Sequence, residues 1–152
     1  MRELALESFF TGYRRTLLAA DELISEVVVP LPGPDQTVRA YKLSKRFEDD
    51  ISAVCLVVSL RRAEGRVHGV RIGVGGMAAT PMRATQTEAS LLGQPWTLAT
   101  VHTAAIVLRQ EFSPISDMRA TADYRREAIG NLLIRLWHEL ETNEPALREL
   151  AR

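Results

Sequence analysis

The sequence predicts an α+β fold, with a small antiparallel sheet of three or four strands and about three helices packed on one face of it. Two observations carry this prediction: segments with strand character fill the first half of the chain, and segments with helical spacing fill the second half. Strands followed by helices, rather than alternating with them, are typical of this class. A length of 152 residues suits one domain, so we expect a single domain over residues 1–152.

Four segments in the first half have strand character. Residues 52–62 form a nearly continuous apolar run, of the kind found in strands covered on both faces, and apolar residues alternate in 67–77. The turn at 63–65 contains glycine, so these two segments should form an antiparallel hairpin. Residues 23–29 and 37–44 are shorter β-rich segments on either side of a turn rich in proline and glycine.

Three segments in the second half have helical spacing. Thr85 and Glu88 have the spacing of an N-terminal capping box, so a short helix should begin there and end near Gly93. Apolar residues three and four positions apart predict two longer helices, over 98–112 and around 129–140. The polar side of the last helix is expected to carry Arg125, Arg126, Arg135 and Glu139.

The composition argues against several functions. Basic and acidic residues number 19 each, and a net charge of zero disfavours nonspecific binding to nucleic acid or to an anionic membrane. No apolar stretch is long enough to span a bilayer, and no secretory signal opens the chain. The default expectation is therefore a reducing, cytoplasmic setting. The single cysteine, Cys55, cannot form an internal disulfide and is expected to be a small buried hydrophobe.

Short motifs for metal or phosphate binding are not found. His68, His102 and His138 are far apart in sequence, and none pairs with a cysteine or carboxylate at metal-ligand spacing. The glycine-rich run 73–76 has neither the dinucleotide pattern nor the nucleoside-triphosphate pattern, and it ends a strand instead of opening a helix. We interpret these glycines as sites of close packing.

The most informative segment is YKLSKRFEDDIS, residues 41–52. It contains the only two lysines of the chain, Lys42 and Lys45, whereas every other basic residue is arginine. Lysine is a compact point charge, so a lysine at the end of a strand can direct an ammonium at a carbonyl or an anion of a ligand. A solvated loop with compensating charges is the alternative interpretation, and the residue types alone leave both open.

Five motifs occur along the chain in this order: FFTGYRRTLL, ELISEVVVP, YKLSKRFEDDIS, GGMAATPMRA and ISDMRATADYRREAIGNLLIRL. Together they resemble the C-terminal part of the FAD-binding subunit of molybdenum hydroxylases. The resemblance is closest to the small subunit of bacterial xanthine dehydrogenases and more distant to carbon monoxide dehydrogenase flavoproteins. It covers nearly the whole chain, and it implies the α+β fold that the patterns predict.

The resemblance also implies a function within an oxidoreductase. In this family, electrons leave a purine at a molybdopterin centre, pass through iron–sulfur clusters and reach FAD, which then reduces NAD. The chain would cover one side of FAD, while the molybdopterin and the clusters lie on other domains or subunits. The implied partners are the upstream FAD-binding and iron–sulfur domains and the molybdopterin-binding large subunit.

The resemblance does not include the glycine segments that bind the phosphates of FAD, which lie in the family's preceding domain. FAD affinity needs a pocket that largely encloses the cofactor, so we expect the isolated chain to bind FAD weakly or not at all. Because the resemblance begins in the middle of the family's polypeptide, we expect that Met1 is not the native beginning of this one.

Four candidate cofactor-binding residues follow from the resemblance. Lys42 matches the strand lysine that contacts the isoalloxazine ring, and Ile24 matches an aliphatic residue that packs near the flavin. The segment from Ser44 to Asp50 resembles a charged loop beside the flavin, to which Arg46 and Asp49 are expected to contribute. No catalytic residue and no metal ligand is expected in this chain.

Two other functions remain open. The chain could be a docking module that holds the flavoprotein against its molybdenum-bearing partner without touching the cofactor. The aromatic and basic residues from Phe9 to Arg15 would suit such an interface, although packing of this cluster on the body, as a loop or short helical turn, is an equal expectation. A free-standing binding domain unrelated to flavin requires that the native protein begins at Met1.

Overall fold

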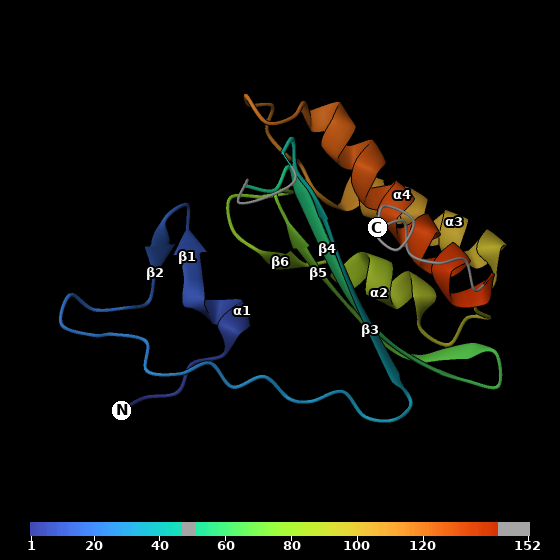
Figure 1. Cartoon of the computed structure of the whole chain (residues 1–152), viewed down its shortest axis with the longest axis horizontal. Coiled ribbons are helices and arrows are strands. Elements are labelled where there is room, and N and C mark those ends of the chain that lie inside the picture. The colour runs from blue at the N-terminus through green and yellow to red at the C-terminus, as the bar shows by residue number, and fades with distance from the viewer. Residues whose placement is uncertain (47–50, 143–152) are drawn as a thin grey trace.

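A computed structural model describes residues 1–46 and 51–142. Its centre is an antiparallel sheet with the strand order β3-β4-β5-β6, and helices cover one face of this sheet (Figure 1). The strands are β3 (Gln36–Leu43), β4 (Val54–Ala63), β5 (Arg66–Gly75) and β6 (Met82–Arg83). The helices are α2 (Thr85–Leu91), α3 (Leu98–Glu111) and α4 (Ala122–Glu141). The predicted α+β class is confirmed.

The β4–β5 hairpin forms where the sequence predicts it. Its two-residue turn consists of Glu64 and Gly65, which have φ angles of 50° and 70°. Two successive positive φ angles match the right-handed twist of the flanking strands, and glycine adopts the second without steric cost. The long ladder from Cys55–Gly75 to Ala63–Arg66 makes this hairpin the centre of the sheet.

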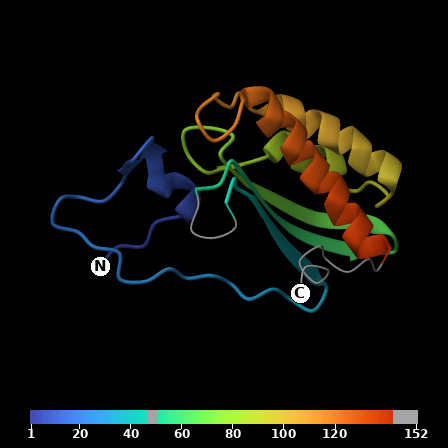
Figure 2. The ribbon, with the colours of Figure 1, turned by 45° about the horizontal axis from the view of Figure 1, so that its top comes forward.

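The two faces of the sheet differ in their environment. Along β4, Val54, Leu56, Val58 and Leu60 are almost fully buried under the helices. The alternate residues Cys55, Val57 and Ser59 lie on the opposite face and are partly or fully exposed. The expected strand covered on both faces is therefore covered on one face only, because the helices over residues 85–91, 98–111 and 122–141 all lie on the same side of the sheet (Figure 2).

The helical layer is built from three packed elements. Helix α2 lies against β5 and α4 against β4, while α3 packs on both α2 and α4. The helix side chains at the core of this layer are Leu91, Val101, Ala105, Leu108, Ile129, Leu133 and Leu136. No helix in the described part of the chain is both long and apolar enough to cross a membrane.

Helix α2 begins at Thr85 as predicted, but the predicted capping box does not form. The side chain of its N-cap residue makes no capping hydrogen bond, and Glu111 of α3 instead accepts hydrogen bonds from the backbone N–H groups of Gln86 and Thr87 at 2.8 and 3.0 Å. Glu88 faces the sheet and accepts the N–H of Ile72 at 2.7 Å. Tertiary partners have replaced the local ones that the spacing indicated.

Residues 1–35 form an N-terminal arm that lies apart from the helical layer (Figure 1). The arm contains a helical turn, α1 (Leu6–Phe9), and a small hairpin of β1 (Phe10–Gly12) and β2 (Arg15–Thr16). The expected packing of this cluster on the body is not observed, since Tyr13 is 74% exposed. An ion pair of 3.0 Å between Glu7 and Arg83 joins the arm to the sheet.

The expected strand at residues 23–29 is wrong in this structure. The segment is extended but unpaired, and Leu23, Val27 and Val28 expose 80, 66 and 76% of their surface. A strand requires a neighbouring edge to satisfy its backbone groups, and no described segment offers one at this place. Residues 23–29 have the composition of a strand but lack a neighbouring strand to pair with.

Candidate functional site

Lys42 lies on the open face of the sheet. It is opposite Cys55 of β4, which is opposite Gly75 of β5, so the three residues form a row across the sheet. Its neighbour Tyr41 points the other way, is buried, and donates a hydrogen bond to Glu139 of α4 at 2.7 Å. Lys42 is exposed, and no described residue forms a hydrogen bond or ion pair with its ammonium.

Most side chains on the open face around Lys42 are small, and Val57, opposite Ala40 and Gly73, is the largest apolar one there. The strand register places Ala40, Cys55, Gly73 and Gly75 on this face near the lysine. A Cβ at Gly73 would meet no atom within 4 Å, so the space above this residue is open. The same register adds Arg61 and Arg71 but no acidic residue from the described strands, which makes the face electropositive.

Cys55 is half-buried, which corrects the expectation of a fully buried residue. Its neighbours in the sequence are apolar, which suggested burial. Successive side chains of a strand point to opposite faces, however, so Cys55 points to the open face while Val54 and Leu56 point to the covered one. Burial raises the pKa of the Cys55 thiol above its ordinary value, and the positive charge of Lys42 offsets part of this rise. The thiol is therefore a neutral side chain beside the lysine at neutral pH.

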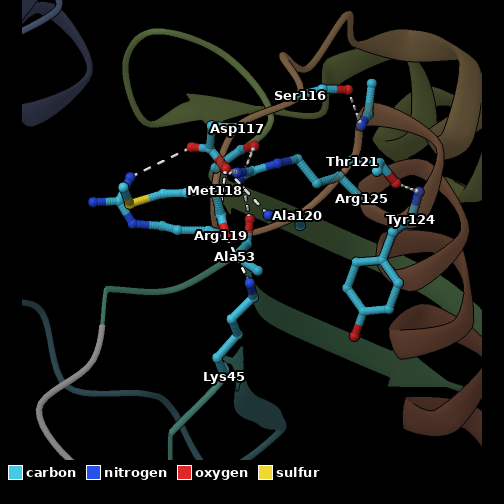
Figure 3. Close-up of polar contacts among 12 residues, drawn as sticks. Lys45, Ala53, Ser116, Asp117, Met118, Arg119, Ala120, Thr121, Tyr124 and Arg125 are labelled. Carbon is cyan, nitrogen blue, oxygen red and sulfur yellow. Dashed lines mark hydrogen bonds and ion pairs between the residues drawn. The ribbon is translucent and has the colours of Figure 1, made fainter.

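The other predicted site residues lie in different places. Lys45 and Arg46 are exposed on the loop after β3, where Lys45 Nζ donates to the backbone carbonyl of Met118 at 2.6 Å (Figure 3). Ile24 belongs to the arm and is 55% exposed. Asp49 lies outside the described residues. The structure therefore places Lys42 on the open face and does not bring Ile24 into the sheet.

Sequence reasoning missed Arg125, which was expected on the polar side of its helix. It is only 3% exposed and projects from the first turn of α4 to the end of the sheet (Figure 3). Its Nη1 donates to the carbonyl of Ala53 and, at 2.9 Å, to that of Gly76, and its Nη2 donates to Asp117 at 2.7 Å. Helical spacing alone cannot reveal acceptors supplied by other elements.

Asp117 organises the turn that precedes α4. Its carboxylate accepts the backbone N–H groups of Arg119 at 2.8 Å and Ala120 at 3.1 Å, in addition to the Arg125 guanidinium. These backbone hydrogen bonds, supported by Arg125, lower the pKa of Asp117 to about 2. The helix itself begins after Thr121, whose hydroxyl accepts the N–H of Tyr124 at 3.2 Å.

Asp117 is therefore expected to make the stability of the protein depend on acid pH. Its pKa is lower in the folded protein than its ordinary value of 3.8, so its contribution is complete above about pH 4 and is lost as the pH falls towards 2. We expect urea unfolding of the wild type to lose stability over this range more steeply than that of Asp117→Asn. Equal slopes for the two proteins would contradict the role of this carboxylate.

One known protein family matches the sheet and its covering helices, and the match does not include the arm. The sequence profile of the CO dehydrogenase flavoprotein C-terminal domain matches residues 39–140, which include almost all of the sheet and the three covering helices. The chain belongs to this family. The matched range contains Lys42, Arg46 and Arg125, whereas Ile24 lies outside it.

Curated relatives agree with this assignment. The chain is 35% identical over 142 residues to nicotinate hydroxylase of Emericella nidulans, covering 89% of this chain and 10% of that protein. It is 34% identical over 143 residues to xanthine dehydrogenase of the same organism, covering 91% and 10%. It is 30% identical over 134 residues to the carbon monoxide dehydrogenase medium chain of Hydrogenophaga pseudoflava, covering 88% and 46%. The chain thus spans less than half the length of these relatives.

Solved structures confirm the fold. Carbon monoxide dehydrogenase from Hydrogenophaga pseudoflava, in a form that lacks the Mo-pyranopterin moiety of the molybdenum cofactor, matches with a TM-score of 0.78 and 33% identity, over 84% of this chain and 44% of that one. Reconstituted CO dehydrogenase from Oligotropha carboxidovorans matches with a TM-score of 0.80 and 25% identity, over 88% and 46%. The family predicted from the five motifs is confirmed.

Proposed function

We propose that this chain forms part of the flavin subunit of a xanthine dehydrogenase-like molybdenum hydroxylase, in which the open face around Lys42 covers one side of FAD. The observation that carries this proposal is the exposed ammonium of Lys42, which stands on the open, electropositive face and away from the helical layer. Membership of a flavoprotein domain family supports it.

The residues on this face fit a planar, electron-accepting ring. The lack of side chains at Gly73 and Gly75 allows close approach of a flat group, and Lys42 supplies a positive charge at its edge. Bound FAD would supply the electron transfer, and the chain would supply shape and electrostatics. A nearby ammonium favours added negative charge, so Lys42 would raise the reduction potential of the flavin.

The remaining parts of the proposal concern the whole enzyme. Residues 1–152 would act as one unit against an upstream FAD-binding domain, with iron–sulfur clusters and molybdopterin on other domains or subunits in the cytoplasm. Electrons from a purine would reach FAD and then NAD. Relatives that are xanthine dehydrogenases support the purine, whereas the nicotinate hydroxylase and the carbon monoxide dehydrogenase indicate other substrates for similar chains.

Substitution Lys42→Met in the intact oxidoreductase tests the flavin contact. Loss of one nearby positive charge should lower the flavin reduction potential by roughly 20 to 45 mV, the equivalent of about 1 to 2 kcal/mol for two electrons. Arg61→Met is the matched control, because it removes a charge from the same face at the other end of β4. Potentiometric titration that finds equal potentials in the wild type and Lys42→Met, with assembly intact, would favour the docking function instead.

The arm supports a contact different from docking on the molybdenum-bearing partner. Leu23, Val27, Val28, Val29 and Leu31 are 66 to 91% exposed, an arrangement that indicates a missing contact surface. We infer that the occupant is the polypeptide equivalent to the part of the medium chain that this chain does not span. The solved CO dehydrogenase from Oligotropha carboxidovorans matches 88% of the 152 residues. The matched region therefore includes part of the 35-residue arm.

The isolated chain is expected to bind FAD weakly or not at all. One exposed sheet face leaves most of the cofactor in solvent, whereas cofactor sites usually enclose their ligand. Titration of the 152-residue chain with FAD, followed by flavin fluorescence, measures the affinity. Binding at micromolar concentration or tighter would mean that the chain holds the cofactor without an upstream partner.

A further inference from the structure

A buried arginine holds the end of the sheet that carries Lys42. The row Lys42–Cys55–Gly75 is the last row in which three strands pair on the open face. Just beyond it lie Ala53 and Gly76, and the carbonyls of both accept hydrogen bonds from Arg125 Nη1. The guanidinium therefore ties the beginning of β4 and the residue after β5 to helix α4 on the covered face.

Ala53 connects this guanidinium to the strand of Lys42. Its carbonyl accepts from Arg125, and its N–H donates to the carbonyl of Leu43 at 2.7 Å. Leu43 directly follows Lys42 and is the last residue of β3. A displacement of Ala53 would thus reach the backbone next to Lys42 through one hydrogen bond.

The second lysine is held by the same cluster. Arg125 Nη2 donates to Asp117, and Asp117 fixes the turn that contains Met118. The carbonyl of Met118 accepts the hydrogen bond from Lys45 (Figure 3). Hydrogen bonds that start at one guanidinium therefore reach the ammonium of Lys45 and the backbone next to Lys42.

A role limited to holding α4 on the sheet would not require this chemistry. Burial of a charged side chain is costly, and a well-packed apolar residue often stabilises a core as well or better. A planar fork donates in fixed directions from separate nitrogens, whereas the three donors of a lysine rotate about a single nitrogen, so the fork holds acceptors from separate segments in a fixed relative geometry. The arrangement matches a need for a fixed backbone geometry at this end of the sheet.

We propose that Arg125 is a positioning residue for the flavin-facing site: with Asp117, it fixes the backbone around Lys42 and so sets where the Lys42 ammonium stands. This inference rests on the proposed function, since it assumes that Lys42 faces FAD. It adds a residue of helix α4, on the far side of the sheet, to the parts of the protein that govern the flavin.

A double-mutant cycle in the intact oxidoreductase tests the proposal. The variants are Arg125→Lys, Lys42→Met and the double variant, and the readout is reoxidation of the dithionite-reduced flavin by ferricyanide, followed by absorbance. We expect Arg125→Lys to change this rate by about threefold or more, and to have almost no effect when Lys42 is already Met. A residue that only stabilises the fold would have the same effect in both backgrounds, and that result would overturn the proposal.

Further variants keep the test decisive. Arg126→Lys is the matched control, because Arg126 is the neighbouring arginine and pairs with exposed Asp123 at 2.8 Å, so the rate should not change. If Arg125→Lys does not fold, Asp117→Asn serves in the cycle, since it removes the charge but keeps an oxygen for the turn. An altered rate in Lys42→Met with no effect of Arg125→Lys or Asp117→Asn refutes the positioning role alone. An unaltered rate in Lys42→Met refutes the proposed function as well.

Discussion

Substitution Gly76→Ala is expected to destabilise the protein by about 3 kcal/mol or more. Gly76 has a φ of 76°, where a Cβ costs about 1 to 2 kcal/mol in any surroundings. At this position the new Cβ would also stand 2.3 Å from the carbonyl oxygen of Ala53, a contact that only a shift of the backbone can relieve. Urea denaturation of the 152-residue chain measures the loss.

Gly93→Ala provides the matched control. Gly93 has the same φ of 76°, but a Cβ there would meet no atom within 4 Å, so only the backbone strain of about 1 kcal/mol remains. The difference between the two variants therefore isolates the contact with Ala53. If both lose the same stability, the tight junction between Gly76, Ala53 and Arg125 is not present in solution.

Charges introduced into the arm are expected to disrupt its docking in the intact flavoprotein subunit. Burial of a valine is worth about 1.5 to 3 kcal/mol, so Val27→Asp with Val29→Asp should cost at least about 3 kcal/mol of docking energy. If the segment docks as a strand, residues 27 and 29 project to the same side, opposite Val28. Limited trypsin digestion after Arg14 and Arg15 reports whether the arm is docked, and FAD content reports the consequence.

The expected result is protection of the arm in the wild-type subunit, rapid cleavage in the isolated chain, and rapid cleavage with loss of FAD in the double variant. Ile106→Asp is the control, because Ile106 is a similarly exposed apolar residue, 53% accessible, on the outer helix α3. Cleavage of the wild-type subunit as fast as that of the isolated chain would show that the arm has no partner there.

Much of the fold could be predicted because its signals are local. Alternation along β5, the turn glycine at Gly65 and helical spacing in α3 and α4 all depend on residues close in sequence. The strand predicted at residues 23–29 is wrong for the opposite reason, because a strand exists only where another segment pairs with it. The capping box predicted with Glu88 is absent for a similar reason, because its carboxylate accepts a hydrogen bond from Ile72 of the sheet and does not cap its own helix.

The candidate site shows the same division. The position of Lys42 on the open face agrees with its place at the end of a strand, whereas its role follows from family resemblance. Arg125 looked like a polar surface residue because its acceptors, Ala53, Gly76 and Asp117, come from three separate segments. Cys55 looked buried because its neighbours are apolar, and only the pleat of the strand distinguishes the two faces.

Alkylation of Cys55 tests most directly whether the open face beside Lys42 covers the flavin. Cys55 is the single cysteine of the chain and stands opposite Lys42 in the register, so its thiol reports access to this part of the face. Iodoacetamide is added to the intact oxidoreductase with FAD bound and after FAD removal, and the Cys55 peptide is quantified by mass spectrometry. We predict several-fold slower alkylation with FAD bound, and equal rates in the two folded forms would show that the flavin does not cover this face.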